Sequence, residues 1–121
     1  MHRTAWLAVA AGNGLIAVLA EVLAGLVLPG LGMPEAAQLV AAGARFQIVH
    51  ALALMALSAL AWPRENVAWL FLYGTLFFSG SVYMRALGLP APILGLAALG
   101  ALLALIGWVK LALGALMRPR A

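Results

Sequence analysis

Cysteine and aspartate are both absent from this sequence of 121 residues, and each absence removes a class of chemistry. Without cysteine the chain cannot form a disulfide, a thiolate metal site or a thiol nucleophile. Without aspartate it cannot form a Ser–His–Asp triad, and no serine motif supports Glu21 as a substitute. The two histidines, His2 and His50, have no second ligand three or four residues away on a helix face. We therefore expect neither catalytic residues nor a metal site in the single chain.

Charge is also scarce. Charged residues make up 8% of the chain and hydrophobic residues 67%, and the mean hydropathy is +1.13. This composition lies outside the range of soluble domains and predicts an integral membrane protein. The net charge of +4 does not indicate nucleic-acid binding, because the cations stand singly at segment ends or in the tail that contains Lys110, Arg118 and Arg120. We expect lipid headgroups to be their partners.

Four long apolar stretches fill almost the whole sequence, over residues 5–28, 36–62, 67–87 and 92–117. Each reaches the roughly 20 residues that cross about 30 Å of hydrocarbon, and Ala and Leu favour helix. Short segments with Pro and Gly separate the stretches, so successive helices run antiparallel. The first stretch is too long for a signal peptide, so it counts as a transmembrane helix. The sequence predicts an all-α membrane protein with one domain over 1–121, an up-down bundle of four transmembrane helices.

Lys and Arg are distributed unevenly between the two predicted membrane faces. Four crossings put both termini and the second loop on one side, and five cations lie near that side against two near the other: Arg3, Arg64, Lys110, Arg118 and Arg120 against Arg45 and Arg85. The positive-inside rule then places both termini in the cytoplasm. All four tryptophans are expected near the same side, as half of an aromatic belt: Trp6, Trp62, Trp69 and Trp108.

Small residues recur at helical spacing in two stretches. Gly100, Gly107 and Gly114 repeat every seventh residue in the last stretch, with Ala104 between the first two. In the first stretch one face combines small residues with an acid: Gly14, Ala17, Glu21 and Gly25. Small residues let helix backbones approach closely in lipid. Both stripes are predicted to pack helices, either within the chain or at a subunit interface.

Ionisable side chains inside a span cost about 2.5–3.5 kcal/mol each on insertion scales, so each needs a partner or a purpose. Glu21 is expected about 10 Å below the non-cytoplasmic end of the first helix, with Arg45 at a similar depth in the second. The two helices are neighbours, so we predict a Glu21–Arg45 ion pair. Arg85 lies near the surface and is predicted to snorkel. A partner molecule is the open alternative for these charges.

A polar stripe runs along the second helix. Gln47, His50 and Ser58 fall within about 80° of one another at about 100° per residue, and His50 is expected near mid-membrane. Interhelical hydrogen bonding is one interpretation; a proton relay, a haem ligand or the wall of a permeation path are the others. The remaining polar residues of the spans are expected to be satisfied by neighbouring backbone or helices: Asn13, Thr75 and Ser79.

Two motifs resemble a known family. The run FQIVHALAL over residues 46–54 and the run FSGSVY over 78–83 are similar to patterns of the small membrane proteins called domain of unknown function 423, related to transmembrane protein 256. The resemblance implies a four-helix bundle in a bacterial inner membrane and no particular activity. The chain departs from the family pattern by lacking a histidine near the end of the first helix, at residues 24–27, and by carrying Glu21 and Arg85.

The leading functional hypothesis is a non-enzymatic accessory or structural subunit of a larger membrane complex, since the loops are short and no catalytic constellation is present. A homo-oligomeric permeation protein for a small solute or ion is the alternative, followed by a cofactor-binding subunit that uses His50. No cofactor is expected, and haem bound through His50 is the alternative to that expectation. The expected partners are the lipid bilayer and other membrane subunits or further copies of the chain.

Overall fold

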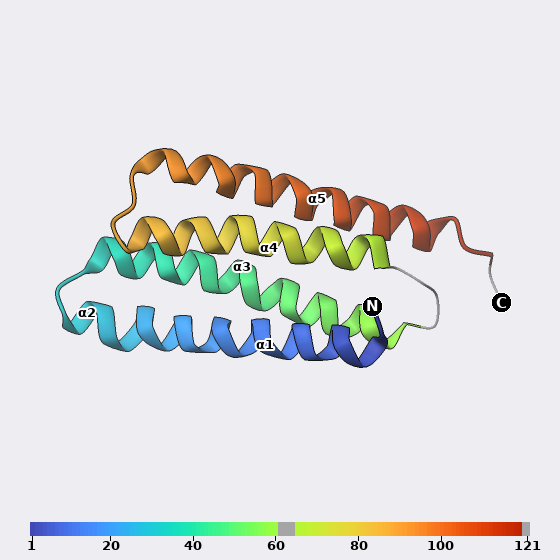
Figure 1. Ribbon diagram of the computed structural model, residues 1–121, viewed down its shortest axis with the longest axis horizontal. Coiled ribbons are helices and arrows are strands. Elements are labelled where there is room, and N and C mark those ends of the chain that lie inside the picture. Colours follow the sequence, from blue (N-terminus) through green and yellow to red (C-terminus); the bar gives the residue numbers. More distant parts are fainter. Residues whose placement is uncertain (61–64, 120–121) are drawn as a thin grey trace.

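The computed structural model describes residues 1–60 and 65–119, and four helical spans account for most of them (Figure 1). The first span, Arg3–Gly30, consists of α1 (Arg3–Val22), a π-helical turn (Leu23–Val27) and α2 (Leu28–Gly30). The second is α3 (Pro34–Ala59) and the third is α4 (Glu65–Ala86). A 3-10 turn (Ala91–Ile93) leads into α5 (Leu94–Leu116). The all-α fold with four transmembrane helices is confirmed.

The turns follow the proline and glycine positions that the sequence indicates. Gly32 has a φ of 71° and Gly88 a φ of 105°, a backbone region that glycine adopts without steric cost. Pro34 is the first residue of α3, where its missing N–H leaves no hydrogen bond unmade. These local preferences explain where the chain reverses between spans.

The second helix ends earlier than the predicted residue 62. α3 ends at Ala59, and Leu60 is already extended, with a φ of −72° and a ψ of 140°. The Arg3 side chain from α1 stabilises this end, because its Nε donates to the Ser58 carbonyl (2.6 Å) and its Nη2 to the Ala59 carbonyl (3.1 Å). Residues 61 and 62 of the predicted span, including Trp62, lie outside the described residues, as do Arg64 and Arg120.

The helices pack in chain order, with α3 and α4 in the middle and α1 and α5 outside (Figure 1). Within residues 1–60 and 65–119, no pair of Cα atoms within 8 Å joins α1 to α5. Each outer helix therefore packs mainly on one neighbour, and single large side chains reach a second helix, as Trp6 of α1 reaches α4 and Trp108 of α5 reaches α3. The rest of its surface faces outward and is largely apolar, apart from Glu21 on α1 and Lys110 on α5, as a span in contact with lipid requires.

Large and small side chains separate along the bundle. Near the end with the termini, Trp6 packs edge to face on Trp69 with ring centroids 5.1 Å apart, within a buried cluster that includes Leu54 and Phe71. Near the other end the buried cluster consists of small residues and one valine: Ala20, Ala24, Val40 and Ala44. A polar layer lies between the two clusters.

Glycines bring α4 and α5 together. A Cβ atom on Gly74 would lie 2.8 Å from the Gly100 carbonyl oxygen, and one on Gly107 would lie 2.7 Å from Cε1 of Phe71. The predicted packing role of Gly100 and Gly107 is confirmed, and their contacts are within the chain. Gly114 is half-buried further along α5.

The packing role predicted for Gly14 and Gly25 is wrong within one chain. A Cβ atom on either glycine would meet nothing within 4 Å, whereas Ala17 is fully buried. The cause is geometric: α1 packs mainly on α3, and its buried face is centred near Ala17. At about 100° per residue, Gly14, Glu21 and Gly25 lie about 40–80° to one side of that centre. They therefore lie outside the helix contact.

Candidate functional site

A chain of hydrogen bonds crosses the middle of the bundle at Gln47. The Gln47 Nε2 atom donates to Asn13 Oδ1 of α1 (3.1 Å), and the Tyr83 hydroxyl of α4 donates to Gln47 Oε1 (2.8 Å). Asn13 Nδ2 in turn donates to the Val9 carbonyl (3.0 Å). Gln47 is buried, so its amide group joins three helices through bonds that no water replaces. The expectation that Gln47 bonds to neighbouring helices is confirmed.

His50 joins α3 to α5. Trp108 Nε1 of α5 donates to His50 Nε2 (3.1 Å), and His50 Nδ1 lies 2.8 Å from the Phe46 carbonyl oxygen. An indole N–H only donates, so Nε2 must accept, and the proton of the neutral ring sits on Nδ1. The imidazole also stacks on Phe46 with ring centroids 4.3 Å apart and meets the Phe71 ring at 5.3 Å. Both ring nitrogens are therefore engaged in packing the bundle.

Three hydroxyl side chains of the spans differ in their hydrogen-bond partners: Ser79, Thr75 and Ser58. Ser79 Oγ donates to the Gly43 carbonyl of α3 (2.7 Å), as expected for a bond between helices. Thr75 is buried, and its Oγ1 has no hydrogen-bond partner among the described residues, contrary to expectation. Ser58 Oγ donates to the Met55 carbonyl of its own helix (2.6 Å), so Ser58 does not belong to the interhelical polar set. The predicted stripe on α3 is reduced to Gln47 and His50.

The predicted Glu21–Arg45 ion pair is wrong within one chain. Both side chains are exposed on the outside of the bundle, and among the described residues the ion pair formed is that of the Met1 amino group with Glu65. Helix rotation is the reason: α3 turns Ala44 toward α1, and Arg45 lies about 100° further round. Glu21 is likewise displaced from the buried face of α1. The intramembrane polar cluster therefore contains Gln47 and His50 but neither charge.

Arg85 lies at the far end of α4, one residue before the helix ends. Its Nη1 atom donates to the Leu89 carbonyl (2.9 Å), and the side chain lines a pocket of about 410 Å³ together with Glu35 from the start of α3. Among the described residues, no group of three His, Cys, Asp or Glu side chains could hold a metal ion.

Tyr83 and Trp108 are the partners that sequence reasoning missed. The sequence assigns Trp108 to an aromatic belt and gives Tyr83 no role of its own, although it stands in the FSGSVY motif. The sequence feature that could have indicated a role for Tyr83 is its place in the second family motif, FSGSVY, since the first motif contains Gln47 and His50. Gly43, which the sequence analysis did not single out, makes room for the Tyr83 ring, since a Cβ atom there would lie 2.5 Å from Cε1.

Comparison with known proteins identifies the family of the chain and a relative named as a membrane protein. Residues 23–102 match the family described as "Protein of unknown function (DUF423)", and the chain belongs to that family. A protein named UPF0382 membrane protein, from Staphylococcus saprophyticus subsp. saprophyticus, is 33% identical over 73 residues. That match spans 57% of this chain and 61% of the relative's length. No solved structure matches the chain. With four apolar spans, the chain is a multi-pass membrane protein of this family.

Proposed function

We propose that this protein is a non-enzymatic transmembrane subunit that assembles with other membrane chains. The observation that supports the proposal is the pair of charges, Glu21 and Arg45, exposed on the outside of the bundle within two spans. At about 1.5 Å per residue, Glu21 lies about 14 Å from Gly30 and Arg45 about 16 Å from Pro34, the ends of their spans on the same side. Both charges therefore lie well inside their spans, at similar depths within the hydrocarbon layer.

A partner chain would offset the free-energy cost of placing these two charges in lipid. Two such charges cost about 5–7 kcal/mol together on insertion scales when they face lipid alone. A neighbouring chain that presents the opposite charge at the same depth removes most of this cost. A second copy inserted the same way meets that condition, because its Glu21 and Arg45 lie at the same depths. A different subunit with its own polar residues meets it too.

The interior of the bundle supports an assembly role over the two alternatives. The side chains of Gln47 and His50 donate to and accept from groups of the same chain, which holds four helices in register. A permeation path would need such groups turned toward a shared space, and a haem would need the lone pair that His50 gives to Trp108. We accordingly propose no resident cofactor and no reaction.

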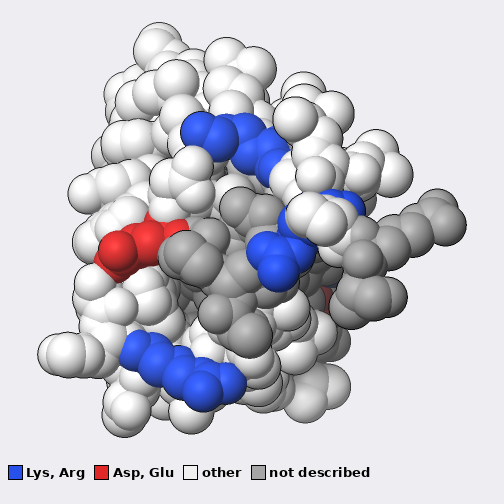
Figure 2. Space-filling model, turned by 90° about the vertical axis from the view of Figure 1, so that its right-hand side faces the viewer, with Lys and Arg blue, Asp and Glu red and all other residues white. Residues whose placement is uncertain are grey.

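We further propose that the chain lies in a bacterial inner membrane with both termini in the cytoplasm. Figure 2 shows the end of the molecule that carries the termini, where several separate basic patches are visible and a smaller acidic area lies at the left edge of the view. Of the five cations counted on that side, Arg3, Lys110 and Arg118 are among the described residues. Excess Lys and Arg on one face is the pattern of a cytoplasmic side.

The assembly proposal is tested by native mass spectrometry after gentle extraction from the membrane. The wild type is expected in a complex heavier than its own 12.5 kDa, and Glu21→Gln and Arg45→Gln should each lower the assembled fraction about tenfold, as for a lost charged hydrogen bond. Glu65→Gln and Lys110→Gln make the same charge changes nearer the membrane surface, the first with loss of the surface ion pair to Met1, and should leave that fraction unchanged. A monomeric wild type, or equal behaviour of all four variants, would contradict the proposal.

The same experiment identifies the partner. Masses at whole multiples of the chain indicate further copies, and other masses indicate a different subunit. If Glu21 pairs with Arg45 of another copy, the double variant should assemble no worse than either single variant. If each charge meets a different partner, the losses should add.

A further inference from the structure

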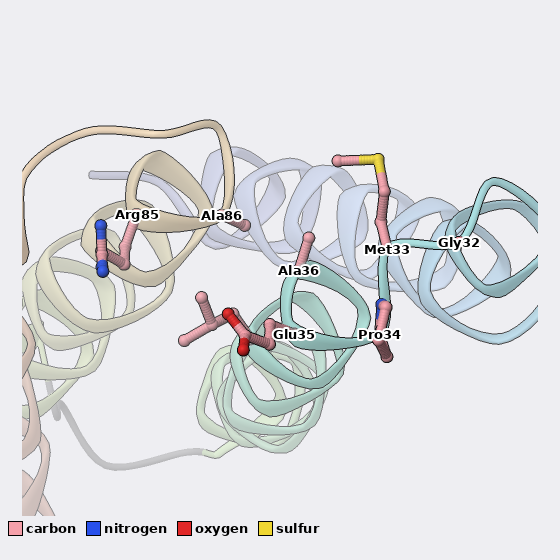
Figure 3. A pocket seen from close by; sticks show the side chains of 8 residues that line it. Gly32, Met33, Pro34, Glu35, Ala36, Arg85 and Ala86 are labelled. Carbon is pink, nitrogen blue, oxygen red and sulfur yellow. The ribbon is translucent and has the colours of Figure 1, made fainter.

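A pocket of about 410 Å³ lies at the end of the bundle opposite the termini. It is formed where the turn after the first span, the start of α3 and the end of α4 meet, and its lining includes Gly32, Met33, Pro34, Glu35, Arg85 and Ala86. Figure 3 shows Glu35 near the start of α3 and Arg85 near the end of α4, on neighbouring helix ends that line the pocket. The volume falls within the range of about 300–1,000 Å³ typical of small-molecule sites.

The two charges in this pocket are opposite in sign and do not pair with each other. Within the described part of the chain, neither Glu35 nor Arg85 takes part in an ion pair, and the Glu35 carboxylate has no hydrogen-bond partner. Arg85 Nη1 donates a hydrogen bond to the Leu89 carbonyl (2.9 Å), and this bond fixes the position of the guanidinium. The Nε and Nη2 atoms remain able to donate to another acceptor. One carboxylate and one partly engaged guanidinium therefore line the same pocket.

The position of the pocket along the membrane normal determines which class of ligand can reach it. Glu35 is the second residue of α3, and Arg85 is the next-to-last residue of α4. Both lie at span ends, where the headgroups of the bilayer begin. The remaining lining is largely apolar, with Met33 and Leu39 beside the charges. A ligand that combines a cation, an anion and an apolar part matches every component of this lining.

We propose that this pocket binds the headgroup of an aminophospholipid of the non-cytoplasmic leaflet. The phosphate lies on the free N–H groups of Arg85, in the manner of guanidinium–phosphate pairs. The primary ammonium group donates to Glu35, and the first part of the acyl region lies against Met33 and Leu39. In this arrangement Arg85 sets the affinity for any phospholipid, and Glu35 sets the preference for a primary amine.

The test is lipid binding to the full chain, measured by native mass spectrometry with phosphatidylethanolamine, phosphatidylcholine and phosphatidylglycerol. The wild type is expected to retain phosphatidylethanolamine about tenfold better than the other two, because a quaternary ammonium cannot donate an N–H bond and a glycerol headgroup carries no cation. Equal retention of the three lipids would overturn the proposal.

Two variants separate the roles of the charges. Glu35→Gln should abolish the preference for phosphatidylethanolamine and leave retention of phosphatidylglycerol unchanged or higher. Arg85→Gln should lower retention of all three lipids. Glu65→Gln and Lys110→Gln make the same charge changes at the opposite end and should have no effect on the preference. A preference that survives Glu35→Gln in a chain that still folds would overturn the assignment.

A soluble competitor distinguishes a lipid from a free zwitterion. Glycerophosphoethanolamine carries the same two charges without acyl chains. If the pocket serves a membrane lipid, millimolar glycerophosphoethanolamine should displace little phosphatidylethanolamine. Complete displacement would show that the site reads the soluble zwitterion, which would overturn the lipid assignment. Lipid retention is read from single chains, so this result does not depend on whether the protein assembles.

Discussion

The close approach of α4 and α5 can be tested by adding one methyl group at Gly74. An alanine Cβ there would lie 2.8 Å from the Gly100 carbonyl oxygen and 3.0 Å from the Ala104 backbone nitrogen. Both neighbours are backbone atoms, which cannot rotate away, so the helices must separate. Overpacking of this kind costs about 1–3 kcal/mol. Replacing a helical glycine by alanine returns about 0.5–1 kcal/mol, and we expect a net loss of about 1–2 kcal/mol.

Gly80 on the same helix provides the matched control, because a Cβ atom there would meet nothing within 4 Å. Gly80→Ala should therefore stabilise the protein by about 0.5–1 kcal/mol. Since the helix-propensity gain is common to both variants, their difference isolates the clash. The free energy of unfolding can be followed by tryptophan fluorescence during titration from mild detergent into dodecyl sulfate. Equal stability of the two variants would refute the glycine contact.

Two further predictions concern the interior and the orientation of the chain. Gln47→Leu leaves two half-buried polar partners, Asn13 and Tyr83, without their bonds to Gln47 and should destabilise the protein by about 1–3 kcal/mol in the same titration. Gln38→Leu at an exposed position of α3 should change stability by less than about 0.5 kcal/mol, and similar effects of the two variants would argue against the hydrogen-bonded chain. With no native cysteine, single cysteines at Leu31 and Met117 should label oppositely with an impermeant thiol reagent in intact cells, and labelling of position 117 alone would reverse the proposed topology.

The four spans could be predicted from the sequence because lipid imposes a simple rule. A crossing segment must be apolar over about 20 residues and must satisfy its own backbone hydrogen bonds, and only a helix does both here. The helix ends differ from the predicted ends by a few residues. α3 ends at Ala59, and the distant Arg3 side chain binds its last two carbonyls. The sequence contains a local stop signal in Pro63, but it does not indicate which distant side chain binds those carbonyls.

The candidate site was predictable in part. Gln47 and His50 stand out because polar side chains inside a span must find partners. The identities of those partners depend on helix rotation, which differs by 100° between adjacent residues. A sequence gives this rotation only when a strong apolar–polar asymmetry exists, and spans that are apolar on every side provide little of it. The same uncertainty explains why the predicted pairing of Glu21 with Arg45 was wrong.

What the sequence by itself determined is the class of the protein: composition and run length place the chain in a membrane as four helices, and two motifs place it in its family. What only the tertiary structure decided is which side of each helix is inside. Packing turned Gln47 and His50 inward and left Glu21 and Arg45 facing outward. It also brought Glu35 and Arg85, 50 residues apart, to one pocket. These outcomes depend on how whole helices fit together, because in lipid close packing, rather than hydrophobic burial, selects the contact face.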